Sequence, residues 1–114
     1  MLGLTVRWSL VDARSRVEQA LASYVEETSH ERFTGKEGLR FKTWRMRPGE
    51  WFEGTYVFDT AAARDEFEAW FLASPSPVTA LTGSGPALVE HFEVVAVAEG
   101  GAGFAAGPGP GSGA

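Results

Sequence analysis

The sequence predicts an α+β protein with the ferredoxin-like order βαββαβ, built on a four-stranded antiparallel sheet. Two strand-like runs at residues 38–47 and 50–59 are rich in aromatic and β-branched residues, and Pro48 and Gly49 lie between them. The second run leads directly into a segment with helical spacing that opens at Thr60. One amphipathic segment precedes this unit and one strand-like run follows it, which completes the six elements.

The first two elements follow from two different periods. Between residues 2 and 10, apolar residues alternate with polar or small ones, which is the period of a strand with one buried face. Residues 13–31 carry apolar side chains at i, i+3, i+4 and i+7, and Ser15 and Glu18 have the spacing of a capping box. We therefore expect a strand and then an amphipathic helix.

The remaining elements have recognisable ends. Pro48 and Gly49 suit the central positions of a type II turn, in which glycine supplies the positive φ. The helix that opens at Thr60 ends at a Ser-Pro pair, and a short helix is expected over residues 78–82 because Ser-Pro precedes it and glycine follows it. The last strand is expected over residues 87–98.

The end of the chain differs in composition from the rest. From Gly100 onward nearly every residue is Gly, Ala, Pro or Ser, and Phe104 is the one large apolar side chain. Such a segment cannot offset the entropy cost of ordering by burying apolar surface. We therefore expect one ferredoxin-like domain at residues 1–98 and a disordered Gly/Ala/Pro-rich tail at residues 99–114.

Composition limits the classes of protein and of site. The chain has 114 residues, enough for one domain, and no cysteine, which excludes disulfides and thiolate sites. A net charge of -5 disfavours nucleic acid and anionic membranes as partners, and residues 54–58 do not match the base-stacking pattern of RNA-recognition modules. No apolar run approaches the roughly 18 residues of a membrane helix, and the N-terminus lacks signal-peptide features, so we expect a cytoplasmic protein.

The sheet is expected to need a partner on its second face. In a ferredoxin-like sheet the helices cover one face only, and the other face meets solvent, a ligand or another chain. In this sequence both faces of the predicted strands carry many aromatic and aliphatic residues. A homodimer would bury the second face by twofold packing, and we expect one.

Three ionisable residues lie in strands that are otherwise rich in apolar side chains: Arg7, Lys42 and His91. A cation inside a sheet usually pairs with a carboxylate, and Glu90 or Glu93 would be that partner. The alternative is a cation that recognises an anion or stabilises an enolate in a cavity. His91 beside these glutamates suits an acid–base pair, whereas two histidines in the chain are a weak indication of a metal, and we expect no metal site.

Five aromatic residues of the predicted strands have two possible roles: Trp8, Trp44, Trp51, Tyr56 and Phe58. They can form the core, or some of them can line a pocket for a flat aromatic ligand, since such pockets combine apolar walls with a few polar groups. The sequence leaves both roles open.

Residues 37–44, Glu-Gly-Leu-Arg-Phe-Lys-Thr-Trp, are followed by Gly-Thr-Tyr-Val-Phe-Asp at 54–59 and an Ala-rich helix. This pattern resembles the YdhR-like monooxygenases of the dimeric α+β barrel superfamily, and the similarity runs from about residue 2 to about residue 97. The resemblance implies two sheets packed face to face as a barrel, and a cavity in which a substrate carbanion reacts with oxygen without a cofactor. Lys42 and Trp44 match the strand motif of the family.

The predicted function is therefore that of a cofactor-independent monooxygenase acting on an aromatic or quinone-type molecule in an apolar cavity between sheet and helices. The candidate catalytic residues are His91, Lys42 and Arg7, and the candidate substrate-binding residues are Trp8, Trp44, Tyr56 and Phe58. The alternative is a non-catalytic homodimeric small-molecule-binding protein, and a third possibility is a structural dimer with a filled core. Haem chemistry is not expected, because neither histidine lies in a haem motif.

Overall fold

The computed structural model describes residues 1–104 and has the predicted ferredoxin-like topology. Its sheet is antiparallel, with the strand order β2-β3-β1-β4. The elements are β1 (Leu2–Ser9), α1 (Val17–Tyr24), the π-helical turn η1 (Val25–Ser29), α2 (His30–Phe33), β2 (Leu39–Arg47), β3 (Trp51–Phe58), α3 (Ala61–Ala73), α4 (Pro77–Thr82) and β4 (Leu88–Glu93). The predicted α+β class and the order βαββαβ are confirmed.

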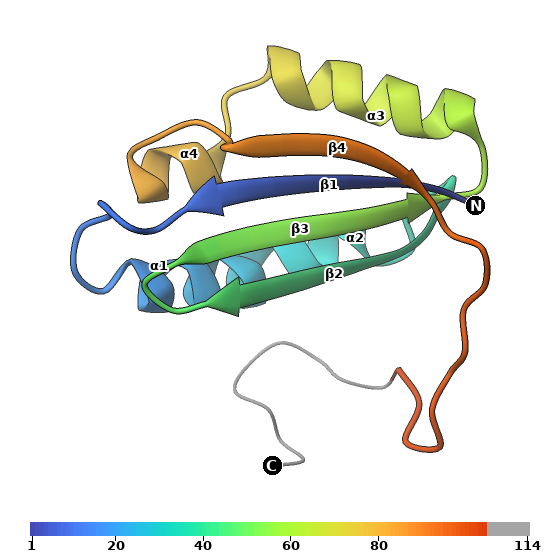
Figure 1. Ribbon diagram of the computed structural model, residues 1–114, viewed down its shortest axis with the longest axis horizontal. Coiled ribbons are helices and arrows are strands. Elements are labelled where there is room, and N and C mark those ends of the chain that lie inside the picture. Colours follow the sequence, from blue (N-terminus) through green and yellow to red (C-terminus); the bar gives the residue numbers. More distant parts are fainter. Residues whose placement is uncertain (105–114) are drawn as a thin grey trace.

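The helices cover one face of the sheet. The helix formed by α1, η1 and α2 lies behind β2 and β3 in Figure 1, and α3 and α4 lie on the side of β1 and β4. The core between the layers is built on the alternating residues Leu4, Val6 and Trp8 of β1, which pack with Leu21 of the first helix and Phe67 of α3. Burying each such side chain contributes about 1.5–3 kcal/mol. Within residues 1–104, no helix has the length and apolar character needed to cross a membrane.

The first helix differs from the prediction at its start and in its middle. It begins at Val17, and the preceding residue Arg16 has a φ of 67°, so the predicted capping box does not form. Glu18 instead accepts a hydrogen bond from the backbone N–H of Gly49, over 2.9 Å. The turn at η1 is π-helical, and it ends at Ser29, whose side chain is buried. Such turns are frequent at functional sites.

Turn and capping chemistry in the second half of the chain matches the prediction. Gly49 has a φ of 77°, and the N–H of Glu50 donates to the carbonyl of Arg47 across the hairpin turn, over 2.9 Å. The side chain of Thr60 caps α3 by accepting from the N–H of Ala63, over 3.1 Å. Short helix α4 has the expected N-cap serine, first-turn proline and left-handed C-cap glycine.

The last strand is shorter than the predicted 87–98. β4 pairs with β1 alone, and its partner strand begins at Leu2, opposite Glu93. One more bond joins the N–H of Val94 to the carbonyl of Met1, and residues 95–104 are not in a strand. The chain then turns back toward β2 (Figure 1), where Phe104 stacks on Phe41 with ring centroids 6.1 Å apart. Most of the predicted disordered tail, residues 105–114, lies outside the described residues.

The face of the sheet that the described helices leave uncovered is called the open face below. Phe41, Val57, Gly3 and Phe92 are successive cross-strand neighbours on it, and a Cβ at position 3 would lie 2.0 Å from the Phe92 ring. Trp51 and Leu88 also lie on this face, and its other residues are polar, with a buried carboxylate at Glu53. The expectation of an apolar second face therefore applies to this row and to Trp51 and Leu88, and not to the whole face.

Candidate functional site

Lys42 lies on the helix-covered face of the sheet because of a local irregularity in β2. A β-bulge between Leu39 and Phe41 interrupts the alternation of the strand, so that Leu39 pairs with Phe58 and Lys42 pairs with Tyr56. Bulges re-aim side chains in this way and are frequent beside active sites.

The amine of Lys42 is surrounded by aromatic rings. Its Nζ lies 3.7 Å from the ring centroid of Phe33 and 4.4 Å from those of Trp44 and Tyr56. The ion pairs of residues 1–104 do not include it. The predicted salt bridge to Glu90 or Glu93 does not form, because β4 lies at the opposite edge of the sheet from β2.

This environment favours the neutral amine. Burial lowers the pKa of Lys42 well below its usual range, and the positive charge of Arg32 lowers it further. The ring faces attract an ammonium group and offset part of this effect. Burial also raises the pKa of the neighbouring Tyr56 phenol, so that this group stays a hydroxyl and can donate a hydrogen bond.

Lys42 and its aromatic neighbours line a cavity of about 110 Å³ between the sheet, the first helix and the connection from α3 to α4. The sheet contributes Trp8, Trp44 and Tyr56, and the first helix contributes Ser29 and Arg32. Although the chain carries a net charge of -5, no residue lining this cavity is Asp or Glu among those that the structure describes. The cavity therefore suits a single aromatic ring that carries an anionic or electron-rich oxygen.

Hydrogen bonds fix the two tryptophans of the wall. The indole N–H of Trp44 donates to the hydroxyl of Ser29, and that of Trp8 donates to the hydroxyl of Thr79, each over 3.0 Å. Gly54 leaves space beside them, since a Cβ there would lie 3.0 Å from the Tyr56 hydroxyl oxygen. The rings are thus held in place before any ligand binds, which lowers the entropy cost of binding.

Two exposed residues mark the outer side of the cavity. The guanidinium of Arg32 lies over the ring of Trp70, 4.8 Å from its centroid, and both residues line the cavity. The site therefore has one cation at the mouth and one amine inside it.

The predicted site residues fall into separate groups. Lys42, Trp8, Trp44 and Tyr56 line the same cavity. The ring of Phe58 is buried in the core against Phe67, with centroids 5.6 Å apart, so it supports the wall from behind.

Arg7 and His91 do not join Lys42. Arg7 lies on the open face, and His91 lies on β4, which β3 and β1 separate from the strand of Lys42. The residues that sequence reasoning missed are Ser29, Arg32 and Phe33, because the apolar period of the first helix does not reveal the π-helical turn that orients them.

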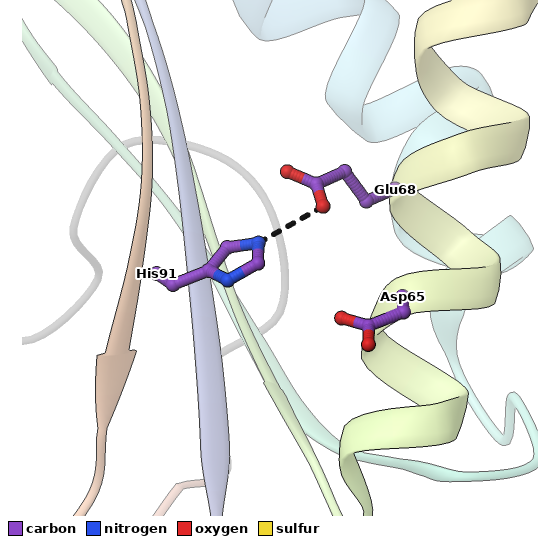
Figure 2. Close-up of side chains that lie close together, drawn as sticks. All are labelled: Asp65, Glu68 and His91. Atoms are coloured by element: carbon purple, nitrogen blue, oxygen red, sulfur yellow. Dashed lines mark hydrogen bonds and ion pairs between the residues drawn. The ribbon is translucent and has the colours of Figure 1, made fainter.

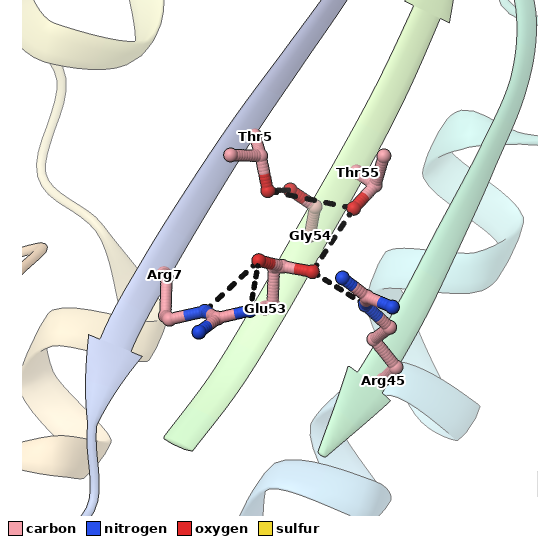
Figure 3. A network of polar contacts seen from close by, with 6 residues as sticks. All are labelled: Thr5, Arg7, Arg45, Glu53, Gly54 and Thr55. Atoms are coloured by element: carbon pink, nitrogen blue, oxygen red, sulfur yellow. Dashed lines mark hydrogen bonds and ion pairs between the residues drawn. The ribbon is translucent and has the colours of Figure 1, made fainter. Parts of the chain in front are cut away.

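Arg7 belongs to a polar network on the open face (Figure 3). The carboxylate of Glu53, which is 2% exposed, accepts from Nε and Nη2 of Arg7, both at 2.9 Å, and from Nε of Arg45. Thr55 adds a hydroxyl donor at 3.3 Å. Burial acts to raise the pKa of Glu53, but the hydrogen bonds from Arg45, Thr5 and Arg7 outweigh it and lower the pKa. This pairing gives Arg7 a structural role.

His91 belongs to a cluster between β4 and α3 (Figure 2). Its Nε2 lies 2.9 Å from Oε1 of Glu68. Asp65 lies nearby, and each of the three residues offers one possible metal-ligand atom. These three atoms lie within 4.8 Å of one another. These are the residues that a divalent cation could use. Asp65 also pairs with Arg64 over 3.0 Å, and His91 shares a hydrogen bond with Glu68, so each of the three side chains has a protein partner.

Comparison with known proteins identifies no close relative. No family model matches the chain, and no curated protein matches it. One similar solved structure is that of a "putative Antibiotic biosynthesis monooxygenase from Chloroflexus aurantiacus J-10-fl", with 23% sequence identity, coverage of 90% of this chain and 98% of that chain, and a TM-score of 0.47. A similarity this distant indicates neither a substrate nor a reaction, so function has to be inferred from the residues of this chain.

Proposed function

We propose that the chain binds a flat phenolic or quinone-type molecule in the Lys42 cavity and oxidises it with molecular oxygen, without a cofactor. The observation that carries the proposal is the environment of Lys42, an amine without a carboxylate partner in an aromatic cavity that no acidic side chain lines among the described residues. The YdhR-like resemblance supports the oxygen chemistry, and the cavity supports the substrate class.

The residues of the cavity suit carbanion formation. A neutral Lys42 amine can remove a proton from an activated C–H group, and the ammonium that results then lies beside the anion it has produced. Arg32 adds a second positive charge, and the aromatic walls limit access of water to the anion. A CH₂ group beside a carbonyl would then take one atom of O₂ as a new C=O, and the other atom would leave as water with the two hydrogens. The reaction consumes only the substrate and O₂, so it needs no further oxidant or reductant.

Binding without chemistry is the second candidate. It is favoured by the position of His91, the predicted base, which lies outside the cavity. In that case the cavity would hold the same ligands, and Lys42 would act only as a hydrogen-bond donor to the oxygen of the ligand.

Substitution of Lys42 tests the binding site. The Lys42→Met variant keeps most of the apolar stem and removes the amine. We expect it to bind 4-nitrophenolate at least about tenfold more weakly, a difference of about 1.4 kcal/mol, and to bind the uncharged 4-nitroanisole as the wild type does. Isothermal titration calorimetry measures both affinities.

The only other lysine of the chain, Lys36, supplies the matched control, since Lys36→Met should bind both compounds unchanged. Equal affinity of wild type and Lys42→Met for the phenolate would refute the binding proposal. Consumption of oxygen with 4-hydroxyphenylacetone, a one-ring phenol with a CH₂ group beside a carbonyl, then separates an oxygenase from a binder, because a binder would hold the compound without oxygen uptake.

We also propose that the chain forms a homodimer through the open face. Phe41 and Phe92 are half-buried and Phe104, which stacks on Phe41, is exposed, and together they give the surface that a second copy would cover. Sedimentation at micromolar concentration should show about twice the chain mass of 12.3 kDa. Phe41→Asp should shift it to the monomer, whereas Leu72→Asp on the exposed side of α3 should not. A wild type that sediments as a monomer would exclude the dimer.

A further inference from the structure

Imine formation by a lysine requires an unprotonated amine, freedom from a carboxylate partner and a carbonyl compound held against the nitrogen. Lys42 satisfies the second requirement, since the ion pairs and side-chain hydrogen bonds of residues 1–104 leave it out. Its lowered pKa supports the first. The requirement that remains is the placement of the carbonyl group.

The cavity can supply that placement. Ring faces of Phe33, Trp44 and Tyr56 lie within 4.4 Å of Nζ, so an aromatic ring that packs against them carries its substituents close to the amine. Arg32 lines the same cavity and can donate to an oxygen atom on the ligand, which makes a carbonyl carbon more electrophilic. Because acidic side chains are missing from the described lining, nothing there competes for the amine.

We propose that Lys42 is a nucleophile that forms an imine with an aromatic aldehyde or ketone held in this cavity. The inference rests on the proposed function in one respect, the binding of a flat aromatic molecule, and it narrows the ligand class to compounds with a carbonyl group. The nitrogen lone pair attacks the carbonyl carbon and gives a carbinolamine. The oxygen then leaves as water with both amine hydrogens, and a C=N bond replaces the C=O bond. The step needs no oxidant or reductant.

The lysine content of the chain makes the proposal easy to test. Lys42 and Lys36 are the only lysines among 114 residues. Lys36 is exposed in the loop between α2 and β2, so it reports the reactivity of an ordinary lysine in the same sample. The N-terminal amine provides a second reference.

The experiment traps the imine by reduction. The wild-type chain is incubated with salicylaldehyde and sodium cyanoborohydride at pH 7, and peptide mass spectrometry measures labelling of Lys42, Lys36 and the N-terminus over time. We expect Lys42 to be labelled at least about tenfold faster than Lys36. Lys42→Arg should lose the fast labelling, and Lys36→Arg should retain it.

Labelling of Lys42 at or below the rate of Lys36 would overturn the inference, and this comparison needs no variant to fold. Failure of the imine proposal can be distinguished from failure of the proposed function. If the wild type binds 4-nitrophenolate through Lys42 but shows no preferred labelling, the binding site stands and the nucleophile does not. If neither is seen, both proposals are wrong.

Discussion

Replacing Glu53 with glutamine is expected to lower the free energy of unfolding by about 2–3 kcal/mol at pH 7. The glutamine keeps the size of the side chain but places an NH₂ donor where Arg7 and Arg45 donate, so at least one guanidinium loses its partner. Breaking a fully buried pair costs about 3–5 kcal/mol, and the loss here is smaller because both arginines reach solvent. Chemical denaturation of Glu53→Gln and wild type measures the difference.

The same variant has a specific pH dependence. Because the folded state lowers the pKa of Glu53, its carboxylate stabilises the fold above the usual pKa of a glutamate, and this contribution is lost as the pH falls through the lowered pKa. The difference between wild type and variant should therefore be full at pH 7 and should shrink below about pH 4.

Asp59 provides the control, because it forms an exposed ion pair with Arg40. We expect Asp59→Asn to change stability by less than about 0.5 kcal/mol. Equal stability of Glu53→Gln and wild type at pH 7 would show that the network in Figure 3 does not hold the sheet together.

Replacing Lys42 with methionine is expected to raise the free energy of unfolding by about 1–2 kcal/mol at pH 7. The wild-type fold buries an amine without a carboxylate partner among the described residues, and the methionine removes that desolvation cost while it keeps the contacts of the stem. Thermal and chemical unfolding of the two chains measures the gain, and Lys36→Met should show almost none. A less stable Lys42→Met chain would mean that the ammonium contributes to the fold.

The sign of the pH effect follows from the lowered pKa. Between the pKa of folded Lys42 and the pKa near 10.4 of an unfolded lysine, the unfolded chain binds more protons, so wild-type stability rises with pH over this range. The methionine variant lacks this term. Its advantage over the wild type should therefore be largest at low pH and should shrink as the pH approaches about 10.

The fold could be predicted because its signals are local. Alternation in β1, the turn at Pro48 and Gly49, and the caps of α3 and α4 each involve residues close in sequence. The β-bulge before Phe41 and the π-helical turn could not be predicted, because packing between distant elements decides where such irregularities occur.

The site could be predicted in part for the same reason. The strand pattern singled out Lys42 and the aromatic residues beside it, but alternation gives the face of a residue and not its cross-strand neighbour. Arg7 lies opposite Glu53 only through the register of β1 and β3, and Glu53 also meets Arg45 only through the register of β2 and β3. His91 likewise finds Glu68 through the packing of α3 on β4.

The π-helical turn also determines the direction in which the row of inward-facing residues runs along the first helix. Its inward-facing residues recur at every fourth position: Val17, Leu21, Val25, Ser29 and Phe33. In a regular α-helix, four residues turn about 40° beyond a full circle, so such a stripe would wind away from the sheet. The wider turn at Val25–Ser29 takes back part of this drift. The same side of the first helix therefore packs into the core at the start of the helix and lines the cavity at its end.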